Sequence, residues 1–159
     1  MFDPGREQTI QIPGGKAVRL GRLTVAVIRA FGEYCAELVG DPFADVERFL
    51  GRAPEADVSR LLKEATEVRD DLRFFTLGTR VAQRALNTEQ GSVRMMLLLM
   101  RQADPRATED DASALVVYLS AVDRMGEVIR KASGGSKDEG EGAEGNAAGA
   151  PTGGSGGAT

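Results

Sequence analysis

The hydrophobic and polar positions divide the first 133 residues into two short alternating runs and five helical stretches. Residues 9–12 and 17–20 alternate polar and apolar side chains on either side of a Pro-Gly-Gly-Lys turn, a pattern that predicts a β-hairpin. A lone hairpin is only marginally stable in water. We therefore expect its apolar face to rest on the helices or to pair with another chain. The residues that would share this face are Ile10, Ile12, Val18 and Leu20.

The rest of the pattern repeats apolar residues every three or four positions, which is the spacing of one helix face. Thr24 and Gly40 are placed as the N-terminal and C-terminal caps of the first helix. Asp41-Pro42 restarts a short second helix, and Thr108 caps the last one. The expected helices cover residues 25–39, 42–50, 55–86, 89–103 and 109–133.

The third helical stretch carries the most regular pattern. Its apolar positions follow a heptad spacing, which is typical of helices that pack along a seam. Leu77-Gly78 would kink this helix or split it in two. The seam either packs inside one domain as part of a helical bundle or binds a partner or a second copy. Its positions are Val58, Leu61, Ala65, Val68, Leu72 and Phe75, continued by Thr79, Ala82 and Leu86.

The fourth helical stretch contains Met95 to Met100, which matches Ala114 to Leu119 as the longest apolar run in the chain. A helix that is apolar on nearly every side needs cover on nearly every side. We therefore expect the other segments to pack around it. The alternative is an adaptable, methionine-rich binding surface of the kind that chaperones use.

The composition changes abruptly at Gly134. Residues 134–159 hold ten of the chain's 20 glycines, and alanine is their only apolar side chain. Such a segment cannot bury enough surface to offset the entropy of ordering it. The sequence thus predicts a flexible N-terminus (1–8), one helical domain with an N-terminal hairpin (9–133) and a disordered, glycine-rich acidic tail (134–159). The fold class is mainly α, a helical bundle of about five helices.

The residue types present exclude several kinds of catalysis. The chain has no histidine, so imidazole base chemistry and histidine-ligated metals are excluded. Cys35 is the one cysteine, and it lies in an apolar helical pattern, so we interpret it as a core residue. The acidic pairs Asp70-Asp71 and Asp110-Asp111 are helix neighbours that do not face each other. We expect no catalytic residue, no cofactor and no metal, and a protein that is not an enzyme.

Apolar runs of six residues are far shorter than the roughly 18 that a membrane span takes. We therefore expect a soluble protein of the reducing cytoplasm, with no membrane partner. Four arginines, Arg69, Arg73, Arg80 and Arg84, fall within about 60° of one another on a helical wheel beside the seam. They form a solvated flank with salt bridges, a charged rim around a helix-binding seam, or a nucleic-acid surface. The last interpretation ranks lowest, because no recognised DNA-binding motif accompanies them.

Two stretches together resemble the tail assembly chaperones of long-tailed bacteriophages. The first is IQIPGGKAVRLGRLTVAVIRAFGEY, a hairpin with a Gly-Lys turn followed by Arg-Leu-Thr at a helix start. The second is LLLMRQADPRATEDDASALV, an apolar helix that runs into Asp-Pro and then into a Thr-capped acidic helix start. The resemblance covers residues 9–119. It implies a small helical protein with a low-complexity tail.

The resemblance implies a non-structural assembly factor in the host-cell cytoplasm. Such proteins bind the long, helical tape-measure protein and keep it soluble while tail-tube subunits polymerise around it. They are often made in two forms by a programmed frameshift. The tape-measure protein, the tail-tube protein and a second copy of the chain are the expected partners. The residues expected to bind the partner are Leu61, Val68, Leu72 and Phe75 of the seam, with Arg73, Arg80 and Arg84 beside it.

Two alternatives from other classes stay open. One is a structural virion protein, such as a head-tail connector or tail component, in which the hairpin adds to a neighbour's sheet. The other is a small helical regulator that binds DNA through the arginines. Presence in finished particles would favour the first, and salt-dependent duplex binding the second.

Overall fold

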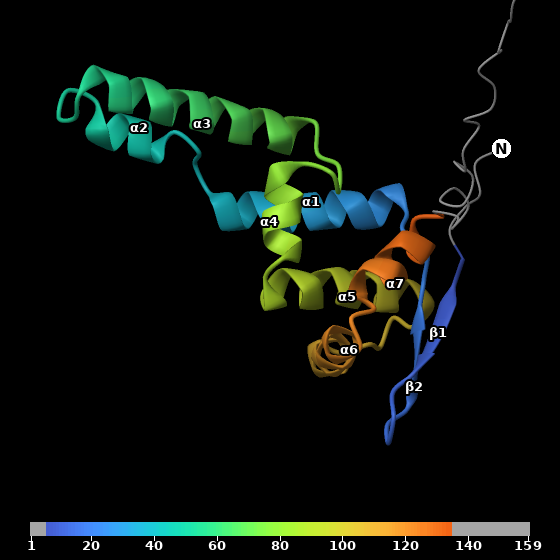
Figure 1. Cartoon of the computed structure of the whole chain (residues 1–159). Coiled ribbons are helices and arrows are strands. Elements are labelled where there is room, and N and C mark those ends of the chain that lie inside the picture. The colour runs from blue at the N-terminus through green and yellow to red at the C-terminus, as the bar shows by residue number, and fades with distance from the viewer. Residues whose placement is uncertain (1–5, 135–159) are drawn as a thin grey trace, which may run out of the picture.

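The computed structural model describes residues 6–134, which form an antiparallel hairpin followed by seven helices (Figure 1). The predicted mainly α fold with an N-terminal hairpin is confirmed. Most of the predicted flexible start (1–8) and all but one residue of the predicted tail (134–159) lie outside the described residues. In chain order the elements are β1 Gln8–Gln11, β2 Ala17–Leu20, α1 Val25–Val39, α2 Ala44–Phe49, α3 Glu55–Arg73, α4 Arg80–Leu86, α5 Glu89–Ala103, α6 Glu109–Ala121 and α7 Met125–Ala132.

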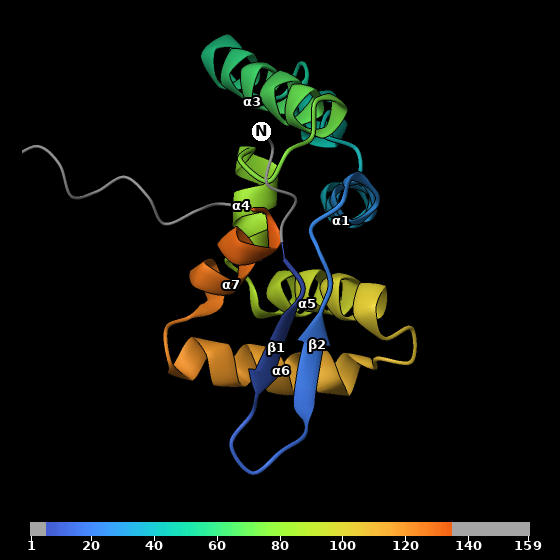
Figure 2. The same cartoon turned by 90° about the vertical axis from the view of Figure 1, so that its right-hand side faces the viewer.

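Helix α5 is the centre of the fold. Met95, Met96 and Leu99 have no measurable exposure, and β2, α1, α4 and α6 all contact this helix. Figure 2 shows α6 below α5, α1 and α4 above it, and the hairpin lying across both α5 and α6. The expectation that other segments pack around the apolar stretch is confirmed.

The corner between α4 and α5 depends on a glycine. A Cβ atom at Gly91 would lie 1.9 Å from the carbonyl oxygen of Ala85, far inside van der Waals contact. Thr88 forms the other half of the corner, because its hydroxyl accepts a hydrogen bond from the Gly91 amide at 3.0 Å. The short connection and the missing side chain let α4 approach the start of α5 closely.

Local capping interactions begin α1 and α6 where the sequence predicts, whereas α2 begins at Ala44 without a side-chain cap and not at the expected Pro42. Thr24 accepts a hydrogen bond from the amide of Val27, and Thr108 forms a capping box with Asp111. Gly40 ends α1 with a φ of 65°, a conformation that glycine adopts without strain. These helix ends depend on contacts between residues a few positions apart, so they can be predicted from the local sequence.

Two of the five expected helices are each divided in two. The third stretch breaks between α3 and α4, where Thr79 becomes the N-cap of α4 and accepts from the amide of Ala82. The last stretch breaks after Ala121, where Asp123 has a φ of 53°, a left-handed conformation that few side chains adopt. Each break turns the chain, so the residues on its two sides no longer share one helix face.

The hairpin rests on the helices through the predicted face. Ile10 pairs with Val18, and Val18 and Leu20 are buried in the core. The amide of Gly21 donates to the carbonyl of Leu99 at 2.8 Å, which ties the end of β2 to α5. The hairpin is thus part of the domain's core.

An ion pair fastens the hairpin turn to α6. The Lys16 ammonium lies 3.1 Å from the Asp111 carboxylate. The hydrogen bond from Lys16, with further hydrogen bonds from Thr108, holds the pKa of the Asp111 carboxyl below its usual 3.8. One carboxylate therefore both caps α6 and anchors the turn.

Helices α2 and α3 form an arm, residues 41–73, that projects from the rest of the domain (Figure 1). Only the C-terminal half of α3 reaches the core, where Val68 and Leu72 pack against it. Just after α3, the ring of Phe75 lies 6.2 Å from the ring of Phe31 and against the backbone of Gly32. The arm is therefore docked at one end.

Replacing Phe75 with alanine should weaken this docking. We expect Phe75→Ala to lower the free energy of unfolding by about 2 kcal/mol, less than for a fully buried phenylalanine because Phe75 is half-buried. Urea denaturation followed by circular dichroism measures the loss. The matched control is Phe74→Ala, because Phe74 is 68% exposed and its loss should change stability by less than about 0.5 kcal/mol. Equal losses in both variants would contradict the docking.

The Lys16–Asp111 ion pair should make stability depend on acid. Because the pKa of Asp111 is lowered on folding, its contribution is present above pH 3.8 and is lost as the pH falls through the lower folded pKa. Lys16→Gln should raise the pKa of Asp111, measured by carboxyl NMR titration. Its destabilising effect should shrink below pH 3.8.

Glu127 provides the internal control for this titration. Hydrogen bonds from Lys131 and Arg124 lower the pKa of Glu127 to about 2, and neither partner is changed in Lys16→Gln. A variant in which the pKa of Asp111 stays where it is in the wild type would show that Lys16 does not set it.

Candidate functional site

A groove opens where the arm meets the helices beneath it. Its walls come from the C-terminal half of α1, from α3 and from α4, and its volume is about 320 Å³. Six apolar residues form the lining, with Thr88 at the start of α5 and Arg84 on α4 as its polar members. The apolar lining consists of Cys35, Leu38, Val39, Val68, Val81 and Ala85.

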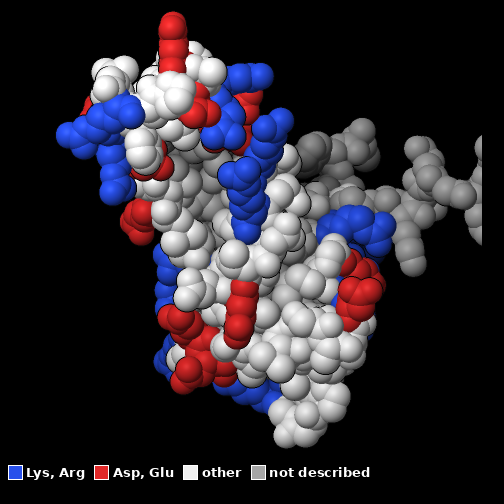
Figure 3. Space-filling model, turned by 60° about the vertical axis from the view of Figure 1, so that its left-hand side comes forward, with Lys and Arg blue, Asp and Glu red and all other residues white. Residues whose placement is uncertain are grey.

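Large apolar side chains are exposed at the groove and on the arm. Eight large hydrophobic residues are exposed among residues 6–134, and five of them lie on the arm, just after it or at the groove. Figure 3 shows charged side chains of both signs over the arm and, below it, a largely uncharged surface with acidic groups at its centre and lower left. Singly exposed apolar residues are ordinary on a protein surface, and one of these five, Leu38, lines the groove. The five are Leu38, Phe49, Leu50, Leu62 and Phe74.

The structure separates the predicted seam residues. Val68 lines the groove, so one of the four apolar positions is available to a partner there. Leu72 and Phe75 pack against the core, and Leu61 is half-buried in the first half of α3. The seam mainly serves packing within the chain, and whether its exposed edges bind a partner stays a prediction.

The predicted arginines also separate. Arg84 lines the groove. Arg80 pairs with Glu67 at 3.1 Å, and the Arg73 guanidinium lies 5.4 Å from the centre of the Phe74 ring. The arm as a whole carries nine acidic and six basic residues between positions 41 and 73. This distribution matches a solvated flank with salt bridges, and it opposes the approach of a nucleic-acid backbone.

Leu38 lines the groove but is not among the residues predicted to bind a partner. Leu38 follows Cys35 by three positions and is 55% exposed, whereas Cys35 is buried. The apolar stripe of α1 thus continues beyond the part of the helix that other elements bury. Val81 and Ala85 were missed because α4 meets α1 only after the turn at residues 74–79.

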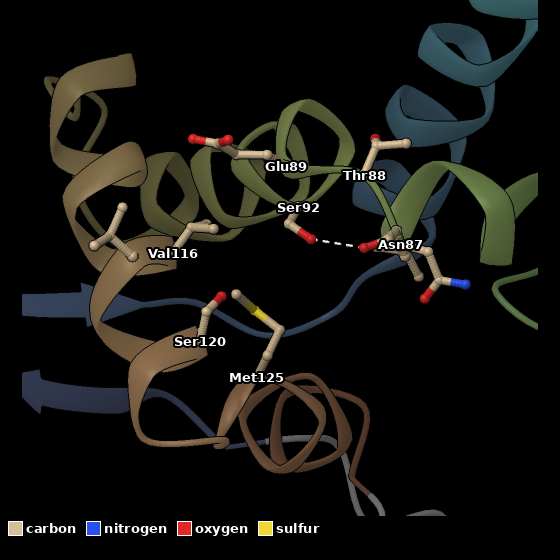
Figure 4. Close-up of a pocket in the computed structure, with 9 residues that line it drawn as sticks. Asn87, Thr88, Glu89, Ser92, Val116, Ser120 and Met125 are labelled. Atoms are coloured by element: carbon tan, nitrogen blue, oxygen red, sulfur yellow. Dashed lines mark hydrogen bonds between the residues drawn. The ribbon is translucent and has the colours of Figure 1, made fainter.

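A second, larger hollow of about 520 Å³ lies between the α4–α5 corner, α6 and α7 (Figure 4). Ser92 points into it, but its hydroxyl already donates to the carbonyl of Leu86 at 2.7 Å. Glu89 is the one titratable side chain in the lining, so this hollow offers no acid–base pair. The lining consists of Leu86, Asn87, Thr88, Glu89, Ser92, Val116, Val117, Ser120 and Met125.

The sole cysteine lines the groove from below. Burial raises the pKa of the Cys35 thiol, so less of the reactive thiolate forms at neutral pH than in an exposed cysteine. Among the described residues no cluster of three or more histidine, cysteine or acidic side chains could hold a metal ion. In the same part of the chain, no helix is long and apolar enough to cross a membrane.

Comparisons of the chain with protein-family models, with curated proteins and with solved structures return no match.

Cys35 reports on the contact between the arm and α1. In the wild type we expect slow alkylation by iodoacetamide, because the thiol is buried and its pKa is raised. Phe75→Ala should speed alkylation more than about tenfold, since loosening the arm by ~2 kcal/mol shifts local opening by a similar factor. Mass spectrometry of quenched samples follows the rate. Phe74→Ala should leave it near the wild-type value, and an equal acceleration in both variants would contradict the link between the arm and Cys35.

Proposed function

We propose that this chain is a non-enzymatic phage tail assembly chaperone, which binds the tape-measure protein and supports tail-tube polymerisation. The observation that supports it most is the open apolar groove between α1, α3 and α4, which the exposed Leu38 lines. The resemblance of residues 9–119 to tail assembly chaperones points the same way. The host-cell cytoplasm is the place where such a protein acts.

A groove of this kind suits an amphipathic helix. Apolar side chains at helical spacing can enter it while their polar neighbours face water, which is a recurring mode of peptide recognition. A tape-measure protein has long helices with apolar stripes, and those stripes need cover before the tail tube encloses them. Holding them requires reversible contact and no covalent chemistry. A second copy of the chain or the tail-tube protein would use the same exposed surface.

A structural virion protein is the second candidate, and one observation favours it. Among the described residues β1 pairs with β2 alone, so its other edge can take a strand from a neighbouring chain. Analysis of purified particles separates the two candidates, because an assembly chaperone is absent from finished tails. The acidic balance of the arm leaves the DNA-binding regulator without support.

Leu38 gives the sharpest test of the chaperone. We expect Leu38→Asp to place a charge at the mouth of the groove and abolish capture of the tape-measure protein, with little loss of stability because Leu38 is 55% exposed. Co-expression with the long helical protein encoded downstream measures it, through the soluble fraction of that protein and its co-purification. The seam variant Leu72→Asp should also abolish capture, but it would weaken core packing as well.

Val25→Asp is the matched control for this experiment. Val25 is 74% exposed at the other end of α1, and an acidic residue suits the first turn of a helix. It should keep the partner soluble at the wild-type level. If Leu38→Asp keeps its fold and still solubilises the partner, the groove does not serve this function. If the wild-type chain fails to solubilise it, the proposed function is wrong.

A further inference from the structure

Arg84 is the charged residue in the lining of the groove. The other lining residues are apolar except for Thr88, whose hydroxyl is already engaged with the Ala85 carbonyl at 2.7 Å and the Gly91 amide. A cation beside an apolar surface is complementary to a ligand that carries both an anionic group and apolar groups. The groove therefore carries a chemical preference as well as a shape.

Neighbouring arginines have partners within the chain, and Arg84 differs from them. Arg80 pairs with Glu67, and Arg69 lies 3.0 Å from Asp70. Among residues 6–134 Arg84 makes no ion pair and no side-chain hydrogen bond, and it is exposed. Its charge is therefore available to an incoming group without first breaking an internal contact.

The surroundings narrow the class of ligand. A nucleic acid would need several cations along its backbone, whereas the groove presents one and the arm is acidic overall. A free small anion would gain nothing from the walls formed by Leu38, Val68 and Val81. An amphipathic helix with an acidic residue at the edge of its apolar stripe satisfies both the walls and the cation.

We propose that the groove recognises apolar helices flanked by carboxylates, and that Arg84 forms an ion pair with an Asp or Glu of the bound helix. This inference rests on the proposed function and adds the chemistry by which the partner segment is selected. The apolar residues hold the helix, and Arg84 chooses among helices that carry the same apolar stripe. A helix with lysine at that edge is disfavoured by like-charge repulsion.

Two synthetic peptides test the selection. They share one stripe of leucines at helical spacing and differ only at the flanking positions, which carry glutamate in one peptide and lysine in the other. Fluorescence anisotropy of labelled peptides gives the affinities, and circular dichroism confirms that both are helical. We expect the wild-type chain to bind the glutamate peptide about tenfold more tightly than the lysine peptide. Raising the salt concentration should reduce this difference.

Charge reversal assigns the preference to one residue. Arg84→Glu should reverse the order of the two peptides. Arg60→Glu makes the same change of net charge at an exposed position outside the groove lining and should keep the wild-type order. If Arg84→Glu keeps the preference of the wild type, or if neither peptide binds, the inference is overturned.

Co-expression of the same variants separates this inference from the proposed function. If the peptides show no charge preference while Leu38→Asp still abolishes capture of the tape-measure protein, only the role of Arg84 is lost. If the wild-type chain does not solubilise that protein, the proposed function fails whatever the peptides show.

Discussion

Burial of α5 is the constraint on which the rest of the structure depends. Met95, Met96 and Leu99 leave water completely, and each such side chain contributes roughly 1.5–3 kcal/mol. No single element can cover a helix that is apolar on nearly every side, so β2, α1, α4 and α6 each take one part of its surface. Because α1 and α4 each pack one face against α5, α3 contacts these two helices only on surfaces that do not face α5. The arm is therefore docked at one end, and the groove is the space that this partial docking leaves.

Much of the fold could be predicted from the sequence because its signals are local. The hairpin, its buried face and the caps at Thr24 and Thr108 depend on residues close together in the chain. The sequence also predicted a kink or a split at Leu77-Gly78, which lies in the turn between α3 and α4, but it did not predict the second helix break. Thr79 fits the heptad spacing, yet it caps a new helix, and the left-handed residue at the second break is Asp123, where no glycine or proline marks the turn. After the first break α4 packs on α5, whereas after the second break α7 packs against α6.

The same breaks explain why the candidate site was only partly predicted. Val68 and Arg84 both line the groove, although a continuous helix would place them about 160° apart. It would also leave Phe75 available to a partner, but the turn after α3 carries that ring onto Phe31. Leu38 and Val81 come together only through the meeting of α1 and α4, which no spacing within one helix can show. Contacts between residues far apart in the chain can thus be identified only from the fold, whereas residues that share one helix face can be identified from the sequence.

In most small domains the same residues must both pack the core and form the outer surface, and the projecting arm separates these two roles. Its exposed side chains, such as Leu62 and Leu50, take no part in covering α5, so substitutions there alter the outer surface without disturbing the core. The corner at Gly91 has no such freedom, because even one added carbon meets the backbone of Ala85. Sequences that share this architecture can thus diverge rapidly over the arm while the corner is kept. A lineage could then adapt to a changed partner in small steps, each made in a molecule that still folds.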